Sequence, residues 1–395
     1  MNRLLLGVFL SSSLGMAGIF SIVPALPAIA DGLGISDARA AYLIASFTFG
    51  SIFVAPFIGL LADKVGRRRV LTPSLMVFGL AGIACGFSDG FTALLLLRFV
   101  QGCGAAALGS LAVTVLSDLY SGPDRIRYFG WNMAATSMGM MFYPFMGGLL
   151  GAMDWRYPFF LSALALPIGV YIHVYLRYPE SLSTPSLKAY VQQFLVSLSN
   201  RRVLWLSVIN FTVFFVFAGA FLSFFSLLIS ETFSELVVVD VLSKTIKLSV
   251  EVFIGLQLVL FSIMVGAVSM SLGRIHQRFG FNPVLASALF FYGVALMLIQ
   301  GSGTLSAMTL SVALLGLAHG CCIPSMVALY TRLAPEGMTG SYVILNSLVF
   351  RLGQTVGPIC LAAVLVGAGI DWVFIVAGVL VLPMSVLAFF TRWRA

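Results

Sequence analysis

Twelve long apolar stretches, separated by short polar segments, constrain the fold of this chain more than any other feature. They lie at residues 4–30, 38–62, 70–88, 91–118, 128–151, 156–177, 202–230, 250–273, 281–300, 304–331, 338–366 and 369–391. A helix that crosses a bilayer needs about 20 apolar residues. Hydrophobic residues make up 60% of the chain and charged residues only 9%, whereas a soluble domain is about 25% charged. The pattern predicts an all-α membrane protein with twelve transmembrane helices and argues against a soluble enzyme.

The first stretch has an alternative interpretation as a signal peptide. Arg3 would then belong to its basic start, residues 4–10 to its apolar part, and Ala28 and Ala30 to the cleavage site. We favour a transmembrane helix, because the apolar run is longer than a signal peptide requires.

Basic residues mark one side of the predicted helices. With the N-terminus placed in the cytoplasm, sixteen of the 22 Lys and Arg residues fall on the cytoplasmic side. The other six lie on the opposite side or within the apolar stretches: Arg39, Arg156, Lys244, Lys247, Arg98 and Arg351. An excess of Lys and Arg in cytoplasmic loops orients membrane proteins. We therefore expect both termini in the cytoplasm and an integral protein of the plasma (bacterial inner) membrane, and we attribute the net charge of +8 to topology rather than to nucleic-acid binding.

The two halves of the chain repeat each other at an offset of 214 residues. Gly59 near the end of the second stretch corresponds to Gly273 at the end of the eighth, and Pro144 in the fifth corresponds to Pro358 in the eleventh. The longest polar segment separates the halves. The expected organisation is an N-terminal six-helix half at 1–177, a cytoplasmic linker at 178–200 and a C-terminal six-helix half at 201–395. Such duplicated halves, with a site between them near mid-membrane, are typical of secondary transporters.

Three motifs resemble those of the major facilitator superfamily, and the resemblance covers essentially the whole chain. Residues 59–69 match its loop signature G-x-L-A-D-x-x-G-R-R/K, and residues 98–104 resemble the R-x-x-Q-G-x-G motif of helix four. Residues 139–148 resemble the antiporter motif G-x-x-x-G-P-x-x-G-G of helix five, with Tyr143 where a glycine is expected. The resemblance implies two pseudo-symmetric six-helix halves and is closest to the twelve-helix drug:proton antiporters.

The resemblance implies a latch in the loop at 59–69. In the superfamily this loop joins the two halves on the cytoplasmic side when the transporter faces outward. Asp63 would contact Arg67, Asp118 and the N-terminus of the eleventh stretch, while Gly59 and Gly66 would permit the tight turn. The alternative is that the basic residues of this loop only fix the topology.

Glycines and prolines of the fifth and eleventh stretches are predicted to take part in conformational change rather than in substrate contact. Proline removes a backbone donor and permits a kink, and small residues let helices pack closely. The candidates are Pro144, Gly147, Gly148, Gly357 and Pro358.

Polar side chains inside apolar stretches are candidates for coupling and binding, because each is costly in a membrane unless it is paired or solvated. Arg98 and Gln101 of the helix-four motif are expected to act in coupling or structure, as the resemblance suggests. His319 is a candidate proton carrier or substrate contact, and the alternative is a hydrogen-bonded interior histidine. The other substrate-binding candidates are Asn132, Asn210, Phe214, Arg351 and Gln354. For these five the alternative is ordinary helix packing or, for Arg351, bonding to backbone carbonyls.

All fourteen acidic residues lie in loops or at the ends of stretches. A pump for cationic drugs is expected to hold a carboxylate in its cavity, so three hypotheses remain open. The first is an anionic or hydrogen-bonding substrate bound with help from Arg351. The second is proton coupling through His319, or through Asp31 or Glu251 if a helix end dips inward. The third is uncoupled facilitated transport.

The sequence predicts a secondary active transporter that moves a small organic molecule by alternating access, with proton-coupled efflux favoured. The alternatives are an uncoupled or import-direction transporter of a small anionic solute, and a non-transporting receptor or structural protein of the same fold. Nucleotide-binding, hydrolase and metalloprotease motifs are absent from the sequence, so we expect no enzyme activity, cofactor or metal. The expected partners are the substrate, protons and the bilayer, and the chain is expected to be monomeric. The segment 231–250 is left open as a short lid or a longer loop.

Overall fold

Helices account for most of the chain in the computed structural model, which describes residues 3–175, 200–233, 236–241, 244–335, 339–391 and 393. Helices satisfy their own backbone hydrogen bonds, which lipid cannot do. Among the described residues, eleven helical segments are long and apolar enough to cross a membrane. The predicted fifth stretch forms α7 (Gly122–Gly151), which is 30 residues long but is not one of the eleven. Glycine, serine, threonine and asparagine residues lower its hydropathy.

The helices form two compact units. The first unit comprises Met1–Pro185 and Ile229–Val259, and the second comprises Ser186–Leu228 and Leu260–Ala395. The linker predicted at 178–200 lies outside the described residues except for Asn200, whose side chain accepts a 3.0 Å hydrogen bond from the backbone N–H of Arg202 and so caps the next helix. The predicted domain boundaries stay a prediction.

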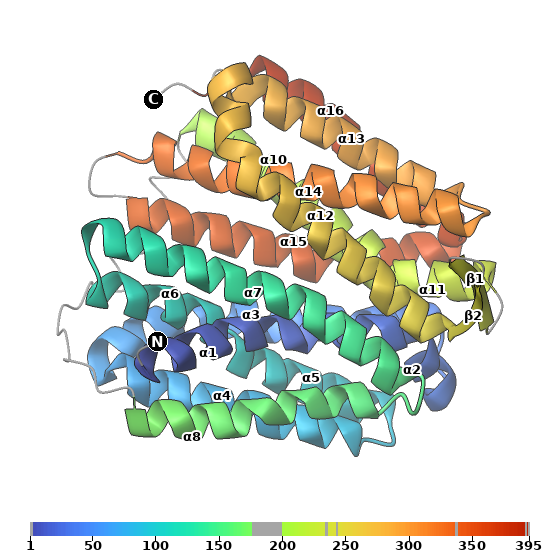
Figure 1. Cartoon of the computed structure of the whole chain (residues 1–395), viewed down its shortest axis with the longest axis horizontal. Coiled ribbons are helices and arrows are strands. Elements are labelled where there is room, and N and C mark those ends of the chain that lie inside the picture. The colour runs from blue at the N-terminus through green and yellow to red at the C-terminus, as the bar shows by residue number, and fades with distance from the viewer. Residues whose placement is uncertain are drawn as a thin grey trace. The chain divides into compact units, whose positions relative to one another are not determined.

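The first unit contains several helices that the sequence predicts as continuous and the structure interrupts (Figure 1). Its elements are α1 (Arg3–Phe20), η1 (Val23–Ala25), α2 (Leu26–Leu33), α3 (Asp37–Val65), α4 (Arg67–Gly86), α5 (Phe91–Ala105), α6 (Leu108–Leu119), α7, η2 (Tyr157–Leu164) and α8 (Ala165–Tyr175). Pro24 and Pro27 follow the end of α1, where they remove backbone donors and prevent one continuous helix. The predicted fourth stretch is divided into α5 and α6 by a turn at Ala106 and Ala107.

The second unit begins with a helix that changes its hydrogen-bonding pattern. Its elements are α10 (Arg201–Val216), the π-helical segment η3 (Phe217–Leu222), α11 (Ser223–Thr232), α12 (Val250–Phe279), α13 (Phe281–Gln300), α14 (Leu305–Leu333), α15 (Thr339–Ala368) and α16 (Ile370–Phe390). The last residues of α11, from Ile229, and the first residues of α12, up to Val259, belong to the first unit. The Ser223 hydroxyl donates to the carbonyl of Ala218 over 2.7 Å beside the π segment. Such segments are rare and occur often at functional sites.

Small residues bring paired helices together in both units. In the first unit, a Cβ on Gly139 of α7 would lie 2.7 Å from the carbonyl oxygen of Ser13 in α1. In the second, a Cβ on Gly353 of α15 would lie 2.6 Å from the carbonyl oxygen of Phe211 in α10. Gly139 and Gly353 are separated by the repeat offset of 214 residues. The internal repeat is therefore visible in the packing of the helices.

The segment left open at 231–250 contains a β-hairpin. Strands β1 (Leu236–Val241) and β2 (Lys244–Ser249) pair antiparallel, with Leu236 opposite Ser249 and Val241 opposite Lys244. β2 runs directly into α12. A run of β-branched residues in β1 favours this structure over helix.

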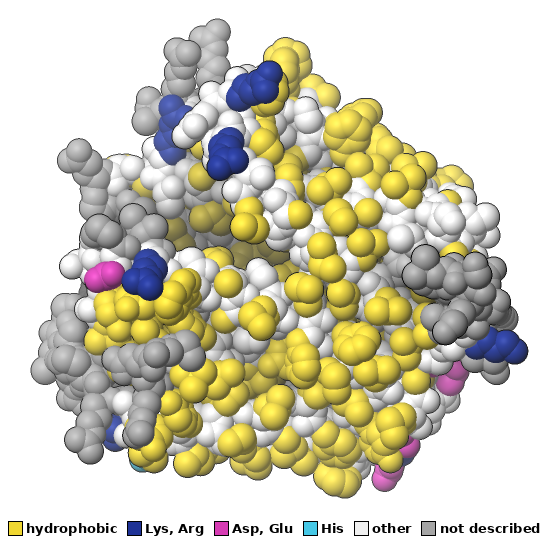
Figure 2. Space-filling model, in the orientation of Figure 1, with side chains coloured by type: hydrophobic (Ala, Val, Ile, Leu, Met, Phe, Trp, Pro, Cys, Tyr) yellow, Lys and Arg dark blue, Asp and Glu magenta, His cyan; other side chains and the backbone are white. Residues whose placement is uncertain are grey.

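Figure 2 shows the side chains of one face of the molecule. Hydrophobic side chains cover the flanks of the helices, and the charged side chains on this face lie near helix ends. Large apolar side chains such as Met270 and Leu310 are exposed by 91% and 73%. Apolar surface of this extent fits a lipid environment rather than water.

Candidate functional site

The loop that carries the motif at 59–69 places one arginine between two carboxylates. Gly66 adopts φ 94°, a conformation that L side chains rarely adopt, and so lets α3 end and α4 begin within one residue. This turn directs Arg67 back toward Asp63, with 3.1 Å between Nη2 and Oδ1. Its Nε donates to Oδ2 of Asp118 at the end of α6 over 2.7 Å.

Arg67, Asp63 and Asp118 are partly shielded from solvent, with 13%, 25% and 29% of their side chains exposed. A guanidinium that bonds two carboxylates is held more firmly than an isolated surface pair, which contributes about 0–1 kcal/mol. Burial, and then the nearby Tyr128 and Asp124, raise the pKa of Tyr120, two residues after Asp118, above its ordinary value. The third expected contact, with the N-terminus of α15, involves the other unit and stays a prediction.

A second polar network lies inside the first unit around Arg98, which is fully buried. Arg98 donates to Oε1 of Gln101 over 2.6 Å, and Gln101 donates to the hydroxyl of Ser162 over 2.7 Å. Arg98 Nε also donates to the carbonyl of Leu43, and the guanidinium carbon lies 4.4 Å from the ring centroid of Phe47. Its Nη2 has no hydrogen-bond partner among the described residues.

This network needs close packing of α4 against α5 and η2. A Cβ on Gly82 of α4 would lie 2.6 Å from Nε2 of Gln101 and would overlap Ser162. Glycine at this position therefore makes room for the hydrogen bond between Gln101 and Ser162. The motif residues Arg98 and Gln101 thus form one network with Ser162, whose participation the sequence analysis missed because nothing in the chain marks it.

The glycine and proline residues of α7 lie in tight helix contacts. A Cβ on Gly147 would overlap the carbonyl oxygen of Ser21, just after α1. A Cβ on Gly148 would lie 2.5 Å from the carbonyl oxygen of Glu251 in α12, and one on Gly255 would lie 2.6 Å from that of Pro144. Backbones approach this closely only where side chains are absent.

Gly357 occupies a similar place in the second unit. A Cβ on it would overlap the carbonyl oxygen of Phe215 in α10, and a Cβ on Gly219 in η3 would lie 2.7 Å from the carbonyl carbon of Gly357. Pro358 follows Gly357 inside α15. The candidate switching residues of α15 therefore lie beside the π-helical segment.

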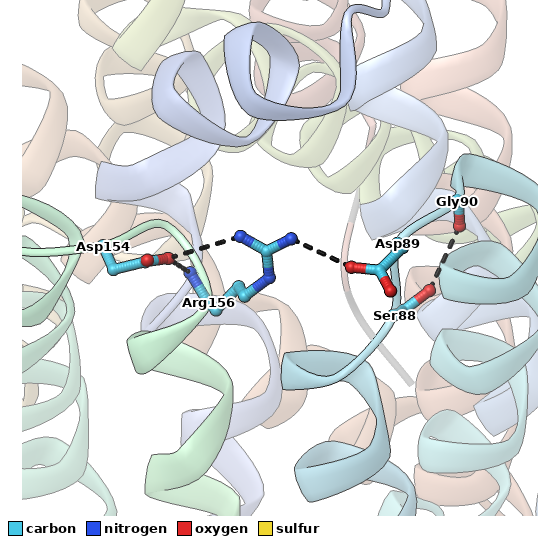
Figure 3. Close-up of polar contacts among 5 residues, drawn as sticks. All are labelled: Ser88, Asp89, Gly90, Asp154 and Arg156. Carbon is cyan, nitrogen blue, oxygen red and sulfur yellow. Dashed lines mark hydrogen bonds and ion pairs between the residues drawn. The ribbon is translucent and has the colours of Figure 1, made fainter.

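A hydrogen-bonded contact at Arg156 joins two loops of the first unit (Figure 3). Its backbone N–H donates to Oδ1 of Asp154 over 2.8 Å, and its Nη2 lies 3.1 Å from Oδ1 of Asp89. The guanidinium carbon also lies 4.3 Å from the ring centroid of Trp155. The contact ties the α4–α5 loop to the segment after α7, as a structural connection.

His319 lies in an aromatic cluster of the second unit and is only 5% exposed. The Tyr292 hydroxyl is 3.2 Å from its Nδ1. Its ring centroid lies 4.4 Å from that of Phe217, 5.3 Å from that of Phe261 and 6.1 Å from that of Phe214. The predicted residues Phe214 and His319 are therefore neighbours, and η3 supplies the nearest ring.

The remaining candidates of the second unit lie around this cluster. The Arg351 guanidinium carbon is 5.6 Å from the ring centroid of Phe350, which is 4.8 Å from that of Phe214. Gln354 lies one turn further along α15 and is partly buried. Asn210 donates to the backbone carbonyl and side-chain oxygen of Asn346, over 3.1 Å each.

Asn132 is the one substrate candidate in the first unit. It lies on α7 with 1% of its surface exposed. Its Oδ1 has no hydrogen-bond partner among the described residues. An unpaired buried amide oxygen is unfavourable, which makes this group available to a ligand or water.

A polar cavity of about 550 Å³ lies in the first unit near the β-hairpin. Four carboxylate residues line it: Asp31, Asp37, Glu231 and Glu251. Asp31 and Glu251 are the conditional coupling candidates predicted from the sequence. Asp37 and Glu231 were not expected beside them, because their proximity depends on how α2, α3, α11 and α12 pack.

Comparison with known proteins decides the family. The sequence profile of the Major Facilitator Superfamily matches residues 8–235 and 221–395. The chain belongs to the Major Facilitator Superfamily. It is therefore an integral membrane transporter, and the predicted major facilitator fold is confirmed.

Individual proteins with similar sequences or similar solved structures agree with this assignment. The chain is 23% identical over 367 residues to the Quinolone resistance protein NorA of Staphylococcus aureus (strain MSSA476), covering 92% of this chain and 90% of that protein. It is 32% identical over 170 residues to the class B Tetracycline resistance protein of Escherichia coli, covering 42% of each chain. It resembles the crystal structure of the nucleoside transporter NupG, with a TM-score of 0.80 at 13% identity, covering 98% of this chain and 100% of NupG. It also resembles the crystal structure of the human organic anion transporter MFSD10, with a TM-score of 0.70 at 20% identity, covering 98% of this chain and 99% of MFSD10. The predicted relation to drug efflux transporters is confirmed.

Proposed function

We propose that the chain exports a small organic molecule by alternating access, with proton entry driving efflux. The double contact of Arg67 with Asp63 and Asp118 carries the proposal, because it holds in place the loop that, by its resemblance to the superfamily motif, would latch the two halves of a protein that alternates between states. The relatives named for quinolone and tetracycline resistance support the outward direction.

The proposal assigns separate roles to the two units. In the first, Gly59, Gly66 and the three latch residues control the conformational change, and Arg98 and Gln101 act in coupling. In the second, His319 is a coupling candidate, and Asn210, Phe214, His319, Arg351 and Gln354 contribute to binding, with Asn132 from the first unit. Pro144, Gly147, Gly148, Gly357 and Pro358 permit helix movement.

Transport in proteoliposomes with an imposed pH gradient tests this function. A quinolone and a tetracycline are the first substrates to use, because the relatives are named for resistance to them. If the protein exchanges substrate for protons, collapse of the pH gradient should stop accumulation of the substrate. Accumulation that is unchanged by the gradient would contradict proton coupling, and failure to move any of a wide panel of solutes would favour a receptor of this fold.

A second candidate is uncoupled or inward transport of a small anionic solute. The buried guanidinium of Arg98 favours it, because Nη2 lacks a hydrogen-bond partner among the described residues. Arg351 would supply a further positive charge in the second unit. Counterflow of organic anions without a pH gradient, together with failure of quinolone and tetracycline transport, distinguishes this candidate from efflux.

A further inference from the structure

An apolar groove lies between three helices of the second unit. It has a volume of about 490 Å³, within the range of ligand sites. Residues on one face of α13 form one wall: Pro283, Val284, Ser287, Ala288 and Phe291. Residues on one face of α14 form the other wall: Leu314, Leu317, Ala318 and Cys321. Ile275 and Phe279 of α12 complete the groove.

The groove is accessible from the surface of this unit. Phe279, Phe291 and Leu317 are exposed by 58%, 47% and 39%. All three helices that form it are long and apolar enough to span a membrane. On α13 the lining runs from Pro283 to Phe291, which is about 12 Å at the helical rise. A groove of this length and apolarity fits part of an acyl chain.

Basic side chains lie close to the groove where α12 ends and α13 begins, near Phe279 and Phe281. The guanidinium carbon of Arg278 lies 5.3 Å from the ring centroid of the groove residue Phe279. The guanidinium carbon of Arg332 lies 5.7 Å from the ring of Phe281, which precedes the groove residue Pro283. Arg274 is exposed beside Ile275.

Acidic residues are sparse in this part of the sequence, and Glu336, four residues after Arg332, lies outside the described residues. From Val252 to Pro335 the chain contains no Asp or Glu, while Arg274, Arg278 and Arg332 all lie within that range. Arginine pairs well with phosphate because its guanidinium donates several hydrogen bonds in one plane. Basic groups near membrane-spanning helices attract anionic lipids.

We propose that this groove binds an anionic phospholipid. One acyl chain lies between α13 and α14, and Arg278 and Arg332 hold the phosphate, with Arg274 adding charge. The site is separate from the residues proposed for transport, so it stands whether or not the proposed function is correct.

Native mass spectrometry of the purified full chain with added phosphatidylglycerol or phosphatidylcholine tests the site. We expect phosphatidylglycerol to bind at concentrations where phosphatidylcholine does not. The double variant Arg278→Gln/Arg332→Gln should weaken binding about 10- to 30-fold, from the contribution expected of two basic residues. Arg127→Gln is the matched control, because Arg127 also lies over an aromatic ring, that of Trp131, in the first unit.

Ser287→Trp tests the groove separately from the charges, because Ser287 is exposed and lines it. We expect this variant to lose phosphatidylglycerol binding while keeping a wild-type elution volume on size exclusion. In two variants that each keep one cysteine, phosphatidylglycerol should slow maleimide labelling of Cys321 in the groove and leave labelling of Cys360, which is exposed on α15, unaffected.

Three outcomes would overturn the proposal. Equal binding of the two lipids would show that the site does not select charge. Wild-type binding in the arginine double variant would remove the assigned phosphate contacts. Unchanged binding in Ser287→Trp, with Cys321 labelled at the same rate with and without lipid, would place the lipid elsewhere.

Discussion

At the residue scale, the most informative arrangement is one cation held by two anions. Arg67 is 3.1 Å from Asp63 and 2.7 Å from Asp118. Removing one carboxylate leaves the arginine with a weaker set of partners and leaves the helices intact, because the contact lies at helix ends. We therefore expect these residues to serve transport more than folding.

We expect Asp63→Asn to abolish transport without preventing membrane insertion, and Asp118→Asn to reduce it at least tenfold. Both changes remove a negative charge that pairs with Arg67, and neither creates a cavity. The measurement is substrate efflux from cells that contain equal amounts of membrane-inserted protein.

Asp89→Asn is the control for this prediction. Asp89 also pairs with an arginine of the first unit, Arg156, but 88% of its side chain is exposed. An exposed pair contributes about 0–1 kcal/mol, so transport should stay near the wild-type level. Normal transport in Asp63→Asn would reject the latch.

His319 carries a second prediction at this scale. If it moves the coupled proton, His319→Ala should bind substrate but lose its response to an imposed pH gradient, as fluxes in proteoliposomes would measure. Tyr292→Phe is the matched variant, because it removes only the hydroxyl that lies 3.2 Å from Nδ1. A retained pH response in His319→Ala would exclude this residue as the proton carrier.

At the scale of elements, local signals predicted some features well and others not at all. The loop glycines mark the α3–α4 turn. The break after α1 at Pro24 and Pro27 was not predicted, because the apolar stretch at 4–30 was interpreted as one helix. The π-helical segment η3 has no such mark, and its Gly219 packs closely on Gly357, a residue distant in sequence. The apolar groove of α12, α13 and α14 and the carboxylate cavity were not predicted, because each combines residues from several helices.

Two glycines of α7 give a prediction about this element. Gly147→Ala should destabilise the protein by about 1–3 kcal/mol, the usual cost of overpacking, because its Cβ would overlap Ser21. Gly130→Ala on the same helix has open space and should be neutral or stabilising by up to about 1 kcal/mol. Thermal unfolding in detergent measures both; equal stability of the two variants would contradict the close packing of α7 at Gly147.

At the scale of the whole molecule, the pattern of the chain predicted more than its individual side chains did. The number and position of the apolar stretches and the repeat at 214 residues predicted a membrane protein with two related halves, and the resemblance of the motifs at 59–69 and 98–104 implied the major facilitator fold. The partners of Arg98 and His319 were not predictable, because a hydrogen bond depends on helix rotation and neighbours. The substrate is less predictable still, because it depends on the shape and chemistry of a site rather than on the fold.

The orientation of the chain in the membrane is a prediction at this scale. Sixteen of the 22 basic residues are assigned to one side, so both termini should be cytoplasmic. Alkaline phosphatase fused after Asn200 should be inactive, because six helices return the chain to the cytoplasm. The same fusion at the C-terminus should also be inactive, because it follows twelve helices. A fusion after Val241, within the hairpin segment and after seven helices, should be active. Green fluorescent protein at the same positions should give the opposite pattern, and an active phosphatase after Asn200 would overturn both the topology and the cytoplasmic linker.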